Sequence, residues 1–148
     1  MPKQTETGTV LFYPGYVDLL GGDITCALIL SQLVEWYMPD KHGFSKLTIK
    51  KNDGTMWMAK SCREWQERFG LSRSQSRRSL HKLRKLGLVE LRIYKVNGTP
   101  TTHIRFPWVH SGHTLAAAPT TTDLQQQMIA IRQQHGNVRQ VPTVTTTD

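Results

Sequence analysis

Cysteines and acidic residues are scarce in this chain of 148 residues, and each shortage excludes a class of protein. The two cysteines, Cys26 and Cys62, form no CxxC pair, so the sequence indicates neither a disulfide scaffold nor a cysteine-ligated zinc site. Each lies in an apolar helical pattern, and we expect both to be reduced, buried thiols. The acidic residues are scattered, which leaves no carboxylate cluster for two-metal nuclease chemistry.

Long hydrophobic runs are also missing. The longest apolar stretch, from Ile24 to Met38, is interrupted by Ser31, Gln32 and Glu35 and is shorter than the ~20 apolar residues that span a bilayer. Residues 1–10 are polar and lack a secretory signal pattern. We therefore expect a cytoplasmic protein that does not enter a membrane.

The motifs of nucleotide and metal chemistry are absent as well. The sequence contains neither a Walker A motif nor a G-x-G-x-x-G pattern, which argues against nucleotide binding. His103, His110 and His113 lie close together, but no cysteine is near enough to complete a metal site. We expect no cofactor, no metal and no enzymatic activity.

Positive charge is abundant and concentrated in one stretch. The chain has 19 lysines and arginines against 11 acidic residues, a formal charge of +8. Residues 60–105 hold 12 basic and 3 acidic residues, a net charge of +9, and the remaining 7 basic and 8 acidic residues give −1. A basic excess confined to one stretch favours nucleic acid or another anionic surface as the partner.

Composition and turn signals divide the chain into five parts. We expect a flexible N-terminus, a domain, a linker, a short amphipathic helix and a low-complexity tail, over residues 1–9, 10–107, 108–121, 122–136 and 137–148. The helix at 122–136 could pack on its own domain, mediate self-association or bind another protein, and the sequence leaves these three alternatives open. A homodimer would match a palindromic DNA site.

The first half of the domain contains one helix that is apolar on nearly all sides. A strand-like apolar segment follows residue 9 and is broken at Pro14. Asp23 then caps a helix that runs to about Met38, where Pro39 stops it. Such a helix is buried on several sides, either by the N-terminal segment or by a second subunit. After this helix, apolar residues that alternate on both sides of a turn at 52–54 predict a β-hairpin.

The second half of the domain predicts a helix-turn-helix followed by a hairpin. Ser61 with Glu64, and Ser72 with Gln75, each form a capping box at a helix start. Gly70 ends the first of these helices, and the second reaches Leu86 before a terminal glycine. The alternating strand that follows turns at Asn97-Gly98, a strong hairpin signal. The expected fold is α+β and mainly helical: a winged helix-turn-helix with an extra N-terminal strand and a C-terminal helical tail.

The helix that begins at Ser72 separates apolar from basic residues. At about 100° per residue, its inward side collects Ser76, Ser79, Leu80, Leu83 and Leu86. The opposite side carries Ser74, Arg77, Arg78, His81 and Lys85, with Arg73 and Arg84 at one edge and Gln75 and Lys82 at the other. The like-charge pair at i,i+4, Arg73 and Arg77, costs roughly 0.2–0.5 kcal/mol. Phosphates would neutralise this repulsion.

We therefore predict contacts with double-stranded DNA from three places. Residues near the N-terminus of a helix in the major groove meet base edges, where arginine pairs with guanine and glutamine with adenine. The candidates on this helix are Arg73, Ser74, Gln75, Arg77 and Arg78, with His81 and Lys85 on the backbone. The hairpin offers Arg92, Lys95 and Asn97, and the N-terminus of the preceding helix offers Lys60 and Ser61.

Three linked segments carry a resemblance to a known family. An apolar helix contains S-Q-L-x-x-W, the helix-turn-helix reads K-[ST]-x-x-E-W followed by G-L-S, and the hairpin reads G-x-P-T-x-H-x-R. Residues 10–107 thereby resemble the winged-helix proteins of phages and plasmids, which are related to the N-terminal domains of replication initiators and replisome organisers. The resemblance implies DNA binding at a promoter or replication origin of a mobile element. We expect no room here for an initiator's second domain, which favours a regulator or accessory factor.

A second interpretation belongs to a different functional class. The same basic surface could bind an acidic protein or a ribonucleoprotein, as a protein-interaction module in counter-defence or as an accessory factor. Both interpretations predict binding that weakens with salt, so charge alone does not separate them.

Overall fold

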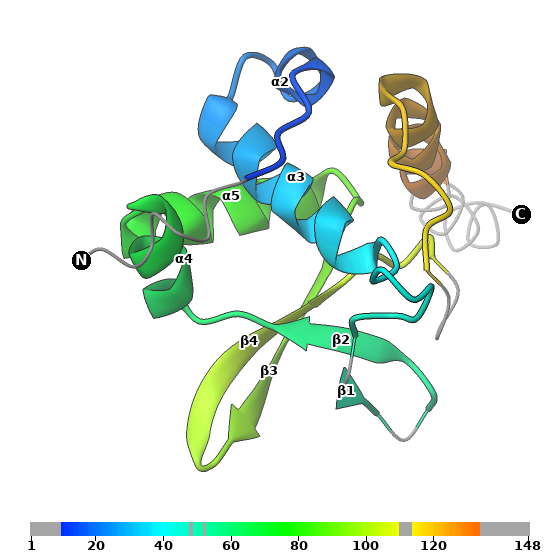
Figure 1. The fold of residues 1–148 in the computed structure, drawn as a ribbon. Coiled ribbons are helices and arrows are strands. Elements are labelled where there is room, and N and C mark those ends of the chain that lie inside the picture. Colours follow the sequence, from blue (N-terminus) through cyan, green and yellow to red (C-terminus); the bar gives the residue numbers. More distant parts are fainter. Residues whose placement is uncertain (1–9, 48, 52, 110–113, 134–148) are drawn as a thin grey trace, which may run out of the picture.

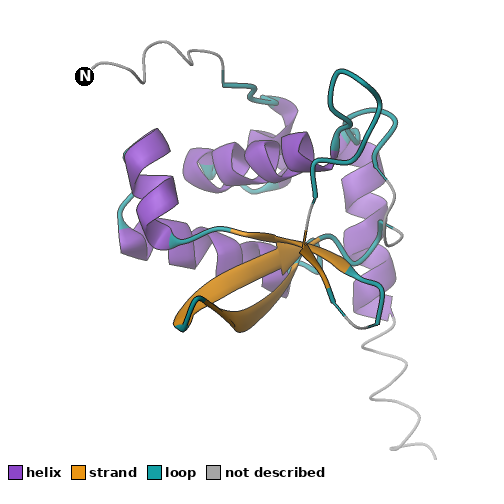
Figure 2. Cartoon of the chain, turned by 60° about the horizontal axis from the view of Figure 1, so that its bottom comes forward, coloured by secondary structure: helices purple, strands orange, loops and turns teal. Residues whose placement is uncertain are grey.

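The computed structural model describes residues 10–47, 49–51, 53–109 and 114–133. They form an α+β domain in which helices lie on one side of an antiparallel sheet (Figures 1 and 2). The helices are α2 (Gly15–Leu19), α3 (Ile24–Tyr37), α4 (Cys62–Phe69), α5 (Arg73–Lys85) and a further helix over 121–133. The strands are β1 (Ile49–Lys50), β2 (Met56–Ala59), β3 (Glu90–Val96) and β4 (Thr99–Arg105), in the sheet order β1-β2-β4-β3.

Helix α3 lies at the centre of the hydrophobic core. It begins where the sequence predicts, because the Asp23 Oδ1 accepts a hydrogen bond from the Cys26 N–H at 3.0 Å, and it ends just before Pro39. Its buried residues cover most of its circumference, although Ile24, at its start, is 65% exposed. The chain's own segments, α2 and α5 among them, provide the cover that the sequence required for this helix.

The predicted N-terminal strand is wrong. Residues 10–13 form neither helix nor strand, and α2 follows them directly. Their backbone groups bond to polar side chains of α3 instead of to a sheet: the Tyr13 N–H donates to Ser31 Oγ at 3.1 Å, and Gln32 Nε2 donates to the Leu11 carbonyl oxygen at 2.8 Å. Pro14, with φ of −58°, fits the start of a helix, so the Pro-Gly pair begins α2.

The sheet joins two hairpins, both of which the sequence predicts. Strands β1 and β2 form the first, and β3 and β4 form the second. The second hairpin turns through Asn97 and Gly98, which have φ values of 52° and 83°, as a two-residue turn of the Asn-Gly type requires. Pairing of Met58 with Ile104 connects the hairpins. The succession of α3, β2, α4, α5 and the β3–β4 hairpin is compatible with a winged helix.

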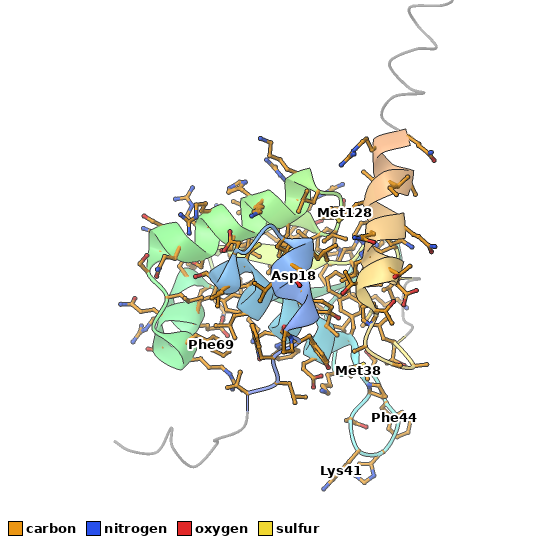
Figure 3. The ribbon with its side chains drawn as sticks, turned by 90° about the horizontal axis from the view of Figure 1, so that it is seen from above. Asp18, Met38, Lys41, Phe44, Phe69 and Met128 are labelled. Carbon is orange, nitrogen blue, oxygen red and sulfur yellow. The ribbon has the colours of Figure 1, made fainter. Side chains whose placement is uncertain are left out.

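The helix over 121–133 packs on its own domain. Leu124 is fully buried in the core, Met128 packs against it, and Figure 3 shows Met128 between this helix and the rest of the domain. The Tyr16 hydroxyl donates a 2.7 Å hydrogen bond to the Pro119 carbonyl oxygen. Of the three alternatives that the sequence leaves open for this helix, the structure shows packing on its own domain. Residues 134–136 of the predicted helix lie outside the described residues.

Gly87 is the point at which this helix meets the end of α5. Gly87 has φ of 83°, and a Cβ placed there would lie 2.6 Å from Ile131 Cγ2. Any side chain at position 87 would therefore strain the backbone and overlap Ile131. Gly98 has the same φ, but a Cβ there would have no heavy atom within 4 Å.

A long-range ion pair fixes α5 against the start of α3. Lys82 Nζ donates to the Leu20 carbonyl oxygen at 2.8 Å and lies 3.2 Å from Asp23 Oδ2. Burial opposes ionisation of the Asp23 carboxyl, but the Cys26 N–H, Lys82 and the charge of Arg78 outweigh it and lower its pKa. The carboxylate that caps α3 therefore also holds α5 in place.

We expect Gly87→Ala to lower the free energy of unfolding by about 2–5 kcal/mol. Roughly 1–2 kcal/mol comes from the left-handed backbone and about 1–3 kcal/mol from overpacking against Ile131. Urea unfolding measures the loss. Gly98→Ala is the matched control and should show the backbone cost alone. Equal losses in the two variants would contradict the close contact at Gly87.

Lowering the pH should reduce the free energy of unfolding of the wild-type protein more than that of the Asp23→Asn variant. The folded pKa of Asp23 lies below its ordinary value of 3.8, so its carboxylate contributes stability that is present above that value and lost as the pH falls through the folded pKa. Asparagine keeps the cap but loses the ion pair, at a cost of about 1 kcal/mol or less. Urea unfolding at neutral pH and at steps below about pH 4 should show the difference between the proteins shrinking. A difference independent of pH would contradict this.

Candidate nucleic-acid interface

Helices α4 and α5 are joined by a tight turn that the capping signals predict correctly. At the start of α4, Ser61 Oγ accepts from the Glu64 N–H, and Glu64 Oε1 accepts from the Ser61 N–H. Gly70 ends α4 in the left-handed conformation, with φ of 71°. Leu71 is buried between the helices, and Ser72 caps α5 at once. The turn therefore fixes the angle at which α5 leaves α4.

Helix α5 buries one side and exposes the other, as its sequence predicts. Ser76, Ser79, Leu80 and Leu83 are buried, and the core beneath them includes α3. The exposed residues of α5 are Arg73, Ser74, Gln75, Arg77, Arg78, His81, Arg84 and Lys85. Figure 3 shows α5 (pale green) at the edge of the domain with nitrogen-tipped side chains pointing outward, and the loop that carries Lys41 at the opposite edge. We call these eight residues the exposed face of α5.

Few acidic side chains of the domain lie near enough to neutralise the positive charge on the exposed face of α5. Within the described ranges, no carboxylate lies within ion-pair distance of its arginines or of Lys85. Arg78 is near enough to Asp23 to contribute to lowering the pKa of that carboxyl. Lys82, at the edge of the helix, is the residue whose charge is paired, with Asp23. The face therefore carries positive charge that few neighbouring groups of the described domain offset.

The capping box at Ser72 restricts what Gln75 can do. Gln75 Oε1 accepts a 2.8 Å hydrogen bond from the Ser72 N–H, and the Gln75 N–H donates to Ser72 Oγ at 3.1 Å. A paired contact with adenine needs both the oxygen and the nitrogen of the carboxamide. With the box closed, one lone pair of Oε1 is already engaged, so a paired contact would have to use the remaining lone pair of Oε1 together with Nε2. Ser74, next to it, is exposed.

Lys60 and Ser61 make more contacts within the domain than the sequence suggests. The Lys60 side chain is only 16% exposed, with its ammonium 3.8 Å from the centre of the Trp36 ring and 3.7 Å from Glu64 Oε2. Burial lowers its pKa, and the charge of Glu64 opposes that effect. The Ser61 hydroxyl and N–H are both used in the capping box. A phosphate at this helix start would also meet the Glu64 carboxylate.

The three candidate DNA-contacting residues of the β3–β4 hairpin are all exposed, but they differ in whether they are ion-paired within the domain. Lys95 and Asn97 are exposed, with Asn97 in the turn. Arg92 is exposed but ion-paired, because its Nη2 lies 3.0 Å from Glu90 Oε2, and Glu90 Oε1 accepts from Arg105 Nε at 2.8 Å. The pairing was missed from sequence, although residues two apart on a strand share a face.

The histidines near the hairpin form no metal-binding cluster among the described residues. No group of three metal-binding side chains comes together there. His103 is buried in β4 with its ring 4.9 Å from that of Tyr94, as expected for a strand residue beside the hairpin. His110 and His113 lie outside the described residues. None of the described helices is both long and apolar enough to traverse a bilayer.

Comparison with known proteins adds no relative. No protein-family model, curated protein or solved structure matches this chain. The resemblance to phage and plasmid winged-helix proteins therefore stays a prediction.

Ser72→Ala should lower the free energy of unfolding by about 1 kcal/mol, because it removes the acceptor for the Gln75 N–H at the start of α5. Ser74→Ala is the matched control: Ser74 is exposed, so its loss should change stability by less than about 0.5 kcal/mol. Urea unfolding of the two variants measures both. Equal effects would contradict the capping box.

Proposed function

We propose that this chain is a winged-helix protein that binds double-stranded DNA through the exposed face of α5. The observation that carries the proposal is the division of α5 into a buried side and a cationic side with few internal partners. The major groove of B-form DNA admits one α-helix. Helix α4, which meets α5 at the tight turn, would cross the backbone beside the groove.

The residues of the interface divide by the part of the duplex that they can reach. Ser74, Arg77 and Arg78 lie in the first half of α5, where a groove-binding helix meets base edges and the nearest phosphates. Arg73 and Gln75 flank them at the helix start. His81 and Lys85 lie one and two turns further along and would contact the backbone. Each good paired contact to a base contributes about 1–3 kcal/mol of discrimination.

The hairpin would lie beside the groove that α5 occupies. Lys95 and Asn97 are exposed near its turn and are candidates for phosphate or minor-groove contacts. Arg92 could join them while paired, since Glu90 engages only one of its terminal nitrogens. Lys60 and Ser61, occupied within the domain, have the weakest case.

We further propose that the protein acts at a promoter or replication origin of a mobile element, as a regulator or accessory factor. This step is supported by the resemblance of three sequence segments, and by an α+β architecture compatible with a winged helix. A homodimer would double the phosphate contacts and match a palindromic site. A cytoplasmic location follows from the proposed target.

Salt titration tests the electrostatic part of the proposal. If about six phosphates are neutralised, log K should fall against log salt concentration with a slope of about −5. Replacing both Arg77 and Arg78 by Ala should reduce the magnitude of this slope by about 2 and weaken binding at least tenfold. Lys41→Ala, on the opposite side of the domain, removes one charge as the control and should leave the slope nearly unchanged.

Selection from a pool of random duplexes separates DNA from a protein target. Enrichment of a common motif, reduced in the Arg77→Ala/Arg78→Ala variant, is the expected result. A pool that shows no enrichment would favour the alternative, in which the same cations bind an acidic protein or a ribonucleoprotein. Binding that is unchanged in the double variant would contradict the assignment of the interface to α5.

A further inference from the structure

Strand β3 continues its apolar stripe beyond the point where the core ends. Leu91 pairs with Ile104, which is fully buried, and both face the helices. Ile93, two residues further along, lies on the same face opposite Thr102 but is 70% exposed. On the neighbouring strand, the chain changes to threonine as it leaves the core, but on β3 it keeps an isoleucine.

The fold does not explain Ile93. The register of the hairpin is fixed by the Leu91–Ile104 pair and by the Asn-Gly turn. The opposite face of the hairpin has its own packing, with the Tyr94 ring 4.9 Å from the ring of His103 and 5.9 Å from that of Trp57. Ile93 therefore completes neither the core nor the hairpin.

Ile93 lies between the helix-turn-helix and the end of the hairpin. The Thr102 carbonyl oxygen accepts a 3.0 Å hydrogen bond from the Lys60 N–H, so the residue opposite Ile93 adjoins the segment that leads into α4. Two strand spacings, about 10 Å, separate Lys60 from Ile93 across the sheet. Lys95 follows on the same face, nearer the turn, and Figure 1 shows the turn projecting past the helices.

We propose that Ile93 is a DNA-contacting residue whose side chain packs against the sugars or base edges of the minor groove, beside the major groove that holds α5. The inference rests on the proposed function and deepens it, because it gives the hairpin an apolar contact in addition to its charges. Apolar side chains are used in this way by minor-groove binders. Lys95, on the same face as Ile93 and two residues nearer the turn, is exposed and positively charged, which suits a polyanion as the group that covers Ile93.

The test compares two exposed isoleucines. Ile93→Thr keeps a β-branched residue suited to a strand and removes most of the apolar side chain. It should weaken binding to a duplex enriched by selection about five- to tenfold, with the salt slope unchanged because no charge is lost. Ile129→Thr, at a position 51% exposed on the helix over 121–133, should alter binding less than twofold. Thermal unfolding checks that both variants are folded.

A second measurement does not depend on the stability of a variant. In wild-type protein with labelled isoleucine methyl groups, the Ile93 methyl should shift on addition of the duplex and show contacts to deoxyribose protons, whereas the Ile129 methyl should do neither. If the wild type binds DNA but Ile93→Thr binds equally well and the Ile93 methyl does not move, the inference is overturned while the proposed function stands. If the wild type binds no duplex at all, both fail.

Discussion

The packing of α5 against the core beneath it is the interaction on which the rest of the molecule depends. Leu80 and Leu83 are buried there together with two serines, and Lys82 bonds to the start of α3 from the edge of the same helix. Because that side of α5 is buried, the arginines on the other side are exposed to solvent. The cationic surface is thus a consequence of core formation and needs no separate stabilisation.

Two local devices keep that surface in a fixed orientation. The capping boxes at Ser61 and Ser72 satisfy the helix starts, and the left-handed Gly70 sets the turn between them. The capping box at Ser72 also holds the Gln75 side chain in place, because Gln75 Oε1 accepts a hydrogen bond from the Ser72 N–H. A helix whose first turn is held this firmly is preorganised, so little conformational entropy would be lost when it binds.

With the exception of the Arg92–Glu90 pair, features encoded by short stretches of sequence were predicted well, and those that depend on distant partners were not. The capped helices, the Asn-Gly hairpin and the buried side of α5 follow from residues within a few positions of one another. The N-terminal strand was wrong because the partners of residues 10–13 are Ser31 and Gln32 on α3. The Asp23–Lys82 pair and the cover of Lys60 by Trp36 likewise join residues far apart in the chain, so no local pattern could have indicated them.

The position of Leu124 changes where the folded unit ends. The sequence places a domain boundary at residue 107, but Leu124 is fully buried in the same core as α3 and β4, and Ile131 lies against Gly87. A fragment that stopped at residue 107 would leave apolar surface uncovered beside the junction of α5 and β3. Helix α5 and the hairpin thus both rest on a helix that follows them in the chain.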